Sequence, residues 1–291
     1  MKKLVKIDAD SLIFYSSKET IEDSIFNIKE RINTILNKTG ATHYMLCLTG
    51  SGCFRYNIYK DYKANRKTGK YPQLLKYLKT LKSFLIEEYN ALLIQELEAD
   101  DLVAFNYTLE DMDQVVSSPD KDVLNQVIGS NYNYGKDEFI NVTTESSDRF
   151  LAWQLLVGDT GDNIKGLESK TDYIKVIYGL DNRKGIGEVT ANRMLDIMDE
   201  KKQDYAIEIL KCYISKYEDD LIPTVISESN SVKVCHPIQT KEEKGFEDYT
   251  LNRHLLQLNI GIGRFNKILE NYDISENIKE VKSINQIQEE F

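Results

Sequence analysis

The sequence has few of the residues that build zinc sites, disulfide frameworks or histidine-based catalysis. It holds four cysteines and three histidines in 291 residues, and no two cysteines form a C-x-x-C pair. Zinc sites and disulfide frameworks need closer grouping, so we interpret the cysteines as reduced, mostly buried thiols. No histidine lies in an H-E-x-x-H or G-x-S-x-G context. Carboxylates are therefore better placed to carry any chemistry.

Long hydrophobic runs are also missing. No run of about 18 apolar residues exists, which excludes a membrane-spanning helix. Asp8 and Asp10 interrupt the apolar stretch at the start of the chain too early for a signal peptide. We therefore expect a cytoplasmic protein, in the host cytoplasm if the source is viral. Hydrophobic residues make up 41% of the chain, which is enough for a substantial core.

Hydrophobic periodicity predicts strands that alternate with helices in the first half of the chain. This order is typical of an α/β fold, with a mostly parallel central sheet and flanking helices. Strand signals become rare after about residue 148, so a helical part should follow. The predicted strands cover 3–8, 43–48, 91–95 and 114–118, and the predicted helices cover 20–38, 74–85, 99–110, 121–127, 149–157 and 188–217. The predicted divisions are 1–148, 149–274 and a polar C-terminal tail over 275–291.

Carboxylates are concentrated in four short clusters, three of which follow a predicted strand. The carboxyl ends of parallel strands meet at one edge of a sheet, so these acids should share a crevice. Neighbouring carboxylates cannot all stay ionised unaided, and oxygen ligands without His or Cys fit Mg²⁺ or Mn²⁺ better than Zn²⁺. Each cluster taken alone is more typical of a helix cap or a solvated turn. The clusters are Asp8 and Asp10; Glu96, Glu98, Asp100 and Asp101; Asp120 and Asp122; and Asp159 and Asp162.

The net charge is −10, yet one segment is strongly basic. Between Arg55 and Lys82 there are nine basic residues, one acid and five tyrosines. Cations can follow phosphates while aromatic rings stack on unpaired bases, as in a channel for single-stranded nucleic acid. The alternative is a solvated helix face, which is the simpler reading of Lys76, Lys79 and Lys82.

Five stretches occur in an order that identifies a family. They are LVKIDADSLIF, FRYNIYKDYKANR, ELEADDL, SPDKDVLNQV, and GDTGDNIKG with a later GIGEVTANRML. Over roughly residues 4–200 the chain resembles the flap endonuclease superfamily, particularly bacteriophage 5′-nucleases and the 5′-nuclease domain of bacterial DNA polymerases. The resemblance implies a PIN-like 5′-nuclease fold in 1–148 with a helical arch over 55–90. It also implies a helix-turn-helix element, similar to a helix-hairpin-helix, in a helical DNA-binding part.

The resemblance also implies two metal sites. The cofactor would be two Mg²⁺ ions, for which Mn²⁺ can substitute. Asp10 and Glu96 have no counterpart in the family. Asp8 matches the aspartate of the first strand. The ligands of the first ion would be Glu98, Asp100, Asp101 and Asp120, and those around the second would be Asp120, Asp122, Asp159 and Asp162.

Roles in DNA handling follow from the same resemblance. Arg55, Lys63 and Arg66 match cations at the base of the arch that contact the scissile phosphate. If Lys63 and Arg66 lay on one helix, their spacing would put both on one face. A glycine-rich turn within 161–187 would offer backbone N–H groups to duplex phosphates. The expected DNA-binding residues are Tyr62, Lys60, Lys67, Lys70, Gly166, Lys184, Gly185 and Gly187.

Two departures from the family pattern stand out. Thr49 occupies the place of an aspartate that usually follows the second strand, which predicts a weaker first metal site. Residues 168–184 interrupt a helix-turn-helix element that is normally compact.

The sequence therefore predicts a structure-specific 5′ nuclease that acts near 5′ ends or single-strand/duplex junctions of DNA and leaves 5′-phosphate and 3′-hydroxyl ends. RNA primers in RNA–DNA hybrids are a further expected substrate. We expect a monomer, with a replication polymerase or a single-strand-binding protein as a partner. The alternatives are a PIN-class ribonuclease and a non-catalytic protein that binds DNA junctions. The basic segment and the G-I-G turn argue against the first, and the retained acids argue against the second.

Overall fold

The computed structural model describes residues 2–66, 72–107, 109, 111–168, 170–180, 185–217, 226–229, 232–235, 241–257 and 272–281. The chain forms two compact units. Unit 1 comprises 1–60, 66–147 and 258–291, and unit 2 comprises 61–65 and 148–257. Asp61–Asn65, from within the basic segment, thus belongs to unit 2. No helix of the described residues is long and apolar enough to cross a membrane.

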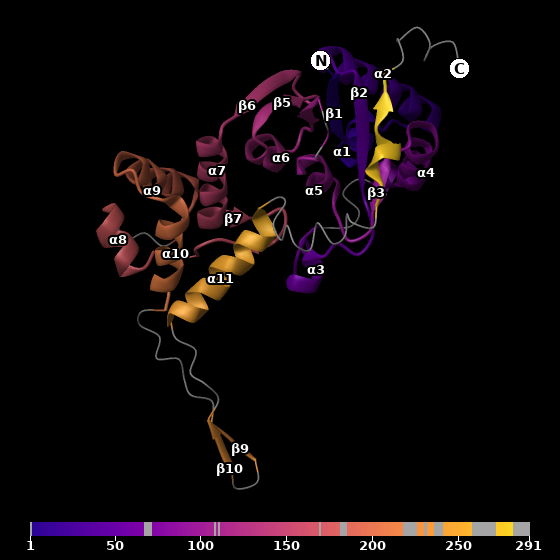
Figure 1. Cartoon of the computed structure of the whole chain (residues 1–291). Helices are drawn as coiled ribbons and strands as arrows, with labels where there is room; N and C mark the ends of the chain where they lie inside the picture. Colours follow the sequence, from indigo (N-terminus) through magenta and orange to yellow (C-terminus); the bar gives the residue numbers. More distant parts are fainter. Residues whose placement is uncertain are drawn as a thin grey trace. The chain divides into compact units, whose positions relative to one another are not determined.

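Unit 1 is built on a central sheet whose inner strands are parallel, as the sequence predicted (Figure 1). β1 lies in the middle, with β2 and then β3 on one side and β4 and then β5 on the other. β6 and β11 join the sheet antiparallel, beside β5 and β2 respectively. The strands are β1 (Lys2–Asp8), β2 (His43–Thr49), β3 (Leu92–Ile94), β4 (Met112–Ser117), β5 (Gly129–Asn133), β6 (Glu138–Val142) and β11 (Lys279–Glu280).

Helices follow most of the parallel strands, and their ends are set by local chemistry. In the longest, the Thr20 side chain accepts the N–H of Asp23 at the start. Gly40 ends it with a φ of 61°, a left-handed conformation that favours glycine. The helices of unit 1 are α1 (Ala9–Ser16), α2 (Ile21–Thr39), α3 (Arg55–Ile58), α4 (Pro72–Tyr89), α5 (Ala99–Ala104) and α6 (Lys121–Gln126).

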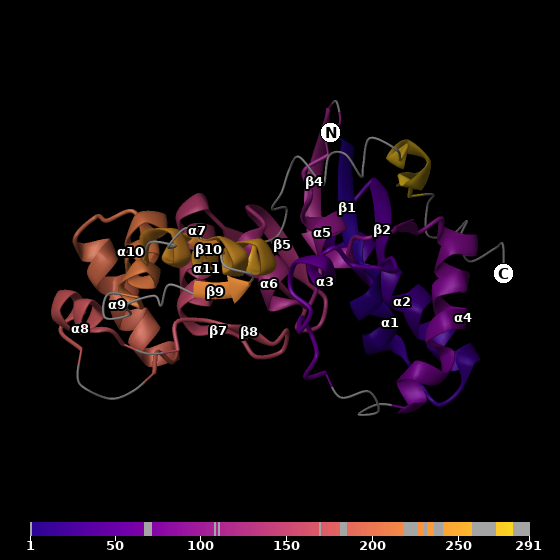
Figure 2. The ribbon, with the colours of Figure 1, turned by 90° about the horizontal axis from the view of Figure 1, so that it is seen from below.

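Alternate residues of the central strands face two hydrophobic cores. Val5 and Ile7 of β1 pack with residues of α1, α2 and α4, whereas Leu4 packs with residues of α5 and α6. This follows from the period of two along a strand. The sheet is therefore covered by α1, α2 and α4 on one face and by α5 and α6 on the other (Figure 2).

Three features of the chain differ from the sequence prediction. The hairpin of β5 and β6 was not predicted, and α5 ends at Ala104 although the pattern predicted a helix to residue 110. The predicted helix over 188–217 is two helices, because Asp204 caps a new helix after a turn. A 3-10 helix, η1 (Ile274–Asn277), and strand β11 lie at the start of the predicted C-terminal tail, and β11 pairs with Tyr44 and His43 of β2; residues 282–291 lie outside the described residues.

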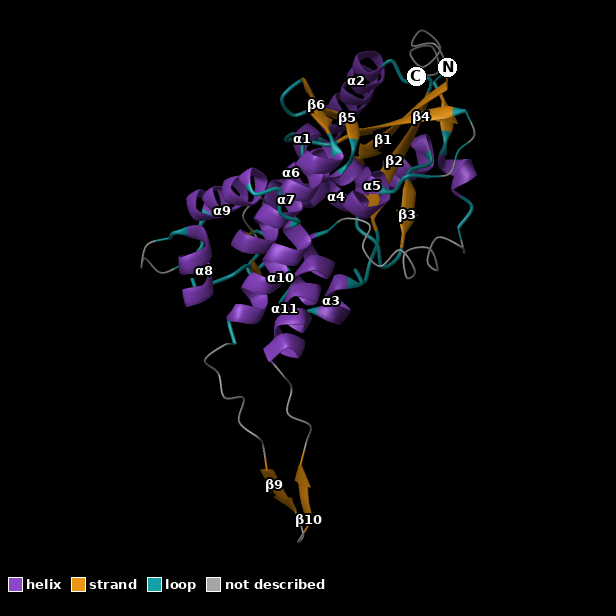
Figure 3. Cartoon of the chain, turned by 60° about the vertical axis from the view of Figure 1, so that its left-hand side comes forward, coloured by secondary structure: helices purple, strands orange, loops and turns teal. Residues whose placement is uncertain are grey.

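Unit 2 is mainly helical in its described residues (Figure 3). Its core includes Met194 and Leu195 of α9 and Ile209 of α10, all fully buried. The Tyr213 hydroxyl of α10 donates to the Leu155 carbonyl of α7 at 2.7 Å. The elements are α7 (Thr144–Val157), which begins in unit 1, then β7 (Gly158–Asp159), β8 (Ile164–Lys165), α8 (Asp172–Tyr178), α9 (Glu188–Glu200), α10 (Tyr205–Ser215), β9 (Ile226–Ser229), β10 (Val232–Cys235) and α11 (Lys241–Leu256).

Candidate active site

Asp8 lies at the carboxyl end of the central strand and is almost fully buried. As the N-cap of α1, its Oδ1 accepts the backbone N–H of Ser11 at 3.1 Å. Its Oδ2 accepts the hydroxyl of Ser118, which follows β4, at 2.9 Å. Burial raises the pKa of the Asp8 carboxyl to about 6, although the hydrogen bonds from Ser11 and Ser118 act to lower it. A charge at this position is therefore costly without a cation.

Ser118 connects Asp8 to the acids that follow β4. Its hydroxyl oxygen accepts the backbone N–H of Asp120 at 3.1 Å while donating to Asp8. Asp120 is the N-cap of α6, and its carboxylate accepts the N–H of Asp122 at 2.7 Å. The sequence prediction named the acids but missed Ser118. A serine before Pro119, at the end of a strand and ahead of an aspartate, was the available signal.

Glu98 and Asp101 form a buried cluster with Arg55 at the start of α5. The Arg55 guanidinium donates to both carboxylate oxygens of Asp101, at 2.7 and 2.8 Å, and to Glu98 at 3.3 Å. All three side chains are at most 10% exposed. Arg55 also lies over the Phe54 ring at 4.7 Å. The structure thus places Arg55 within the core of unit 1, where it neutralises two acids; its expected contact with a scissile phosphate stays a prediction.

The acids of unit 1 have the chemistry of a hard-cation site. Among the described residues, no three His, Cys, Asp or Glu side chains converge closely enough to hold one ion directly. Mg²⁺ keeps several of its own waters and is usually bound through only one or two protein carboxylates. Asp8 and Asp120, joined through Ser118, offer oxygen ligands only. Asp100 precedes Asp101 in the first turn of α5 and is half-buried.

In unit 2, the segment Asp61–Asn65 lies against the loop that carries the last acidic pair. The Tyr62 hydroxyl donates to Asp162 Oδ2 at 3.0 Å, and Lys63 Nζ lies 3.9 Å from the same oxygen. The Asn163 side chain donates to the Asp61 carbonyl at 2.8 Å. Two predicted DNA-binding or catalytic residues, Tyr62 and Lys63, are therefore held by one predicted metal ligand.

Asp159 organises that loop from inside. It is buried, and its Oδ1 accepts the N–H groups of Gly161 and Asp162 at 2.7 and 3.2 Å. The paired strands β7 and β8 come very close, so a Cβ on Gly158 would lie 2.4 Å from the Gly166 nitrogen. A Cβ on Gly166 would lie 2.4 Å from the Leu156 carbonyl oxygen, so both positions require glycine.

The expectation that Lys63 and Arg66 share a helix face is wrong. Residues 60–65 form turns, and Lys63 has a φ of 57°. Its backbone N–H donates to the Asp162 carbonyl at 2.8 Å, which replaces the hydrogen bond a helix would make. Such a backbone conformation costs on the order of 1 kcal/mol or more in a non-glycine residue, so the surrounding contacts must stabilise it. Lys60 is exposed at the start of these turns, while Lys67 and Lys70 lie outside the described residues.

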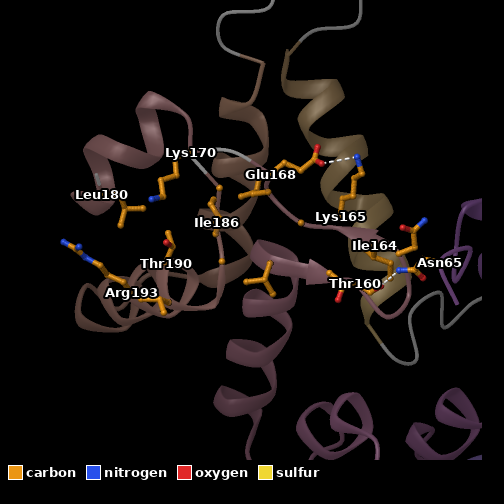
Figure 4. Close-up of a pocket in the computed structure, with 17 residues that line it drawn as sticks. Asn65, Thr160, Ile164, Lys165, Glu168, Lys170, Leu180, Ile186, Thr190 and Arg193 are labelled. Carbon is orange, nitrogen blue, oxygen red and sulfur yellow. Dashed lines mark hydrogen bonds and ion pairs between the residues drawn. The ribbon is translucent and has the colours of Figure 1, made fainter. Parts of the chain in front are cut away.

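A groove of about 890 Å³ lies at the glycine-rich turns of unit 2 (Figure 4). Gly166, Gly185 and Gly187 line it, and Gly187 is the N-cap of α9; their contact with DNA phosphates stays a prediction. Cations that the sequence prediction did not assign to DNA binding also line it: Lys165, Lys170 and Arg193. Lys165 pairs with Glu168 at 3.1 Å, and Leu180, from the inserted segment, forms part of the wall. Lys184 lies outside the described residues.

A family model described as "5′-3′ exonuclease, N-terminal resolvase-like domain" matches residues 4–149. Flap endonuclease Xni of Pseudoalteromonas translucida (strain TAC 125) is 27% identical over 182 residues, which cover 58% of this chain and 69% of that protein.

Two solved structures share the fold. The T5 D15 protein, co-crystallized with metal ions, is 17% identical with a TM-score of 0.57, over 93% of this chain and 98% of that one. The T5 5′-exonuclease with bound zinc is 16% identical with a TM-score of 0.54, over 92% and 93% of the two chains. Because the family model spans half of the sequence and all the acid-bearing strands of unit 1, the chain belongs to the 5′-3′ exonuclease family, which includes the flap endonucleases.

Proposed function

We propose that this chain is a structure-specific nuclease that hydrolyses phosphodiester bonds of DNA near 5′ ends and at 5′ flaps, with Mg²⁺ as its cofactor. The observation that carries the proposal is the Asp8–Ser118–Asp120 connection at the carboxyl ends of β1 and β4. It lies within the part of the chain that matches the exonuclease family. The flap endonuclease name of the bacterial relative supports the choice of substrate.

The residues of unit 1 would bind the cation through Asp8 and Asp120, with Glu98, Asp100 and Asp101 as further acids at the same end of the sheet. When bound, two divalent ions supply a hydroxide nucleophile and stabilise the leaving oxygen in phosphodiester cleavage. Burial makes a charge on Asp8 costly, and the hydrogen bonds from Ser11 and Ser118 offset only part of that cost. A bound cation would therefore compensate the charge of Asp8. By the resemblance, Asp122, Asp159 and Asp162 are assigned to the second ion.

Unit 2 would provide most of the binding to duplex DNA. The groove beside α9 combines cationic side chains with glycines that let a phosphate approach the backbone. Tyr62 and Lys63 lie together on the Asp162 loop, with Lys63 Nζ 4.8 Å from the centre of the Tyr62 ring. The Tyr62 ring is only 3% exposed, so it is suited to hold Lys63 and Asp162 in place rather than to stack on a base.

The test is cleavage of an end-labelled 5′-flap DNA with Mg²⁺ and with a chelator. We expect cleavage near the junction with Mg²⁺ only, and products that carry 5′-phosphates. Asp120→Ala should abolish most cleavage at saturating Mg²⁺ and leave flap binding intact. Asp113→Ala is the matched control, because Asp113 is an exposed aspartate at the opposite end of the same strand, β4.

The same experiment separates the alternatives. A chain that binds the flap without cutting it under any metal condition would be a junction-binding protein. Preferential cleavage of single-stranded RNA would indicate a PIN-class ribonuclease. Near-normal turnover by Asp120→Ala would contradict the assignment of the metal ligands.

A further inference from the structure

We propose that Asp10 is a positioning residue. Together with Lys82 it fixes Thr49 at the end of β2, and Thr49 in turn fixes the start of α5, where the acids Glu98 and Asp101 lie. The inference rests on the proposed function, because the α5 acids are its metal ligands.

Asp10 is held from two sides. One carboxylate oxygen accepts the backbone N–H of Thr49 at 3.0 Å, and the other lies 2.8 Å from Lys82 Nζ. The same ammonium donates to the Thr49 carbonyl at 3.2 Å. The Asp10 and Lys82 side chains are 28% and 24% exposed, so the pair is partly shielded from water. Asp10 and Lys82 therefore engage both backbone groups of Thr49.

Thr49 passes this constraint to α5. Its hydroxyl accepts the N–H of Ala99, the first residue of α5, at 2.9 Å. The next residue, Gly50, donates its N–H to the Leu97 carbonyl at 3.1 Å. A Cβ on Gly50 would lie 2.1 Å from the Ile94 carbonyl oxygen, so the two chain segments touch. The backbone on both sides of Glu98 is thus tied to the end of β2.

Lys82 is suited to this task because its helix is firmly anchored. Leu81 and Leu85 of α4 are fully buried in the core that also contains Leu12 of α1 and Leu48 of β2. The Lys82 side chain leaves this core at the carboxyl end of the sheet and meets Asp10 there. Lys82 is therefore neither a solvated lysine nor an open cation for DNA; it joins α4 to α1 and β2.

The consequence concerns metal affinity. Partners that orient the ligands of a metal are typically worth about 10- to 100-fold in metal affinity or activity. If Asp10 and Lys82 orient α5 through Thr49, removing either one should weaken metal binding. If Asp10 were itself a ligand, Lys82 would compete with the metal for it, and removing Lys82 should strengthen binding. The two roles predict opposite signs for one variant.

The experiment measures Mn²⁺ binding to the full chain by electron paramagnetic resonance, without DNA. Asp10→Ala and Lys82→Met should each weaken Mn²⁺ binding by about tenfold. The double variant should bind Mn²⁺ with about the same affinity as the single variant that binds it less tightly. Lys79→Met is the matched control: Lys79 is an exposed lysine on the same helix, and its removal should leave Mn²⁺ binding unchanged. Far-UV circular dichroism checks that each variant is folded.

The Thr49 side chain provides a second, gentler test. Thr49→Ser keeps the hydroxyl that accepts the Ala99 N–H, whereas Thr49→Val removes it at nearly constant volume. We expect normal Mn²⁺ binding for Thr49→Ser and weakened binding for Thr49→Val.

Three outcomes would overturn the inference. Lys82→Met could bind Mn²⁺ as tightly as the wild-type chain or more tightly, or the losses of affinity in the two single variants could multiply in the double variant. Thr49→Val could also bind Mn²⁺ as tightly as Thr49→Ser. If the wild-type chain cleaves flap DNA and binds Mn²⁺ while the variants are unchanged, this inference alone fails. If the wild-type chain neither cleaves nor binds Mn²⁺, the proposed function fails and the inference fails with it.

Discussion

The buried cluster of Arg55, Glu98 and Asp101 gives the sharpest prediction about stability. Replacing Arg55 with methionine keeps an apolar stem of similar length and removes the charge. Two carboxylates that are at most 10% exposed would then lose the guanidinium that donates three hydrogen bonds to them. Both acids are also tied to the start of α5, where Glu98 is the N-cap and Asp101 lies in the first turn.

The expected loss is large on the scale of a folded domain. Breaking a buried ion pair by removing one partner costs about 3–5 kcal/mol, because it leaves an uncompensated buried charge. Domains are typically stable by about 5–15 kcal/mol, so Arg55→Met should remove a substantial part of the stability of unit 1. Arg55→Lys should cost less, because it keeps the charge but loses the planar fork that engages both oxygens of Asp101.

The assay must distinguish the two units. The single tryptophan, Trp153, lies in unit 2, so its fluorescence reports on that unit. Hydrogen exchange of the β1 and β2 amides in urea reports on unit 1, and these amides should lose protection at lower urea in Arg55→Met. If Glu98 and Asp101 also bind metal, added Mg²⁺ should recover part of the loss.

The control is Lys38→Met, which breaks an exposed pair with Asp137 in the same unit. Both side chains are about half exposed, at 48% and 58%, so water already screens the pair and its loss should cost far less than the loss of Arg55. An Arg55→Met variant no less stable than Lys38→Met would refute the argument from burial.

Three further predictions concern the acids and cations of the site. In a chelator, the stability of the wild-type chain relative to Asp8→Asn should fall by about 2–3 kcal/mol as the pH rises from 4 to 7. The sign follows because burial raises the Asp8 pKa from 3.8 to about 6, so the folded state binds the proton more tightly than the unfolded state does. Urea unfolding of both chains at pH 4 and pH 7 should show this change. An equal difference in unfolding free energy at the two pH values would contradict it. Lys63→Ala should slow single-turnover cleavage by about two to three orders of magnitude, whereas equal slowing by Lys76→Ala would deny Lys63 a special role. Thr49→Asp should lower the Mg²⁺ concentration for half-maximal cleavage, since a carboxylate can still accept the Ala99 N–H while adding a charge; an unchanged titration would show that no ligand is missing there.

Local patterns were sufficient for the parallel core of unit 1 and for the position of its acids. Ile28, Ile32 and Ile35 repeat at helical spacing and are buried in α2, where the periodicity predicted a helix. Asp8 ends β1, and Asp120 follows β4, as the pattern of strands followed by acids predicted. Such features depend on residues close in sequence, so the order of the residues alone reveals them. The five ordered stretches added the family.

Only the tertiary structure decided which charges compensate one another. The sequence did not reveal that Arg55 pairs with Glu98 and Asp101, which lie far along the chain. Lys82 was weighed as a solvated lysine, yet it holds Asp10 and Thr49. Strand β11 is two residues long and has no local signal of its own, because its stability comes from pairing with β2. In each case the partner is distant in sequence, and packing of whole elements brings it within hydrogen-bonding distance.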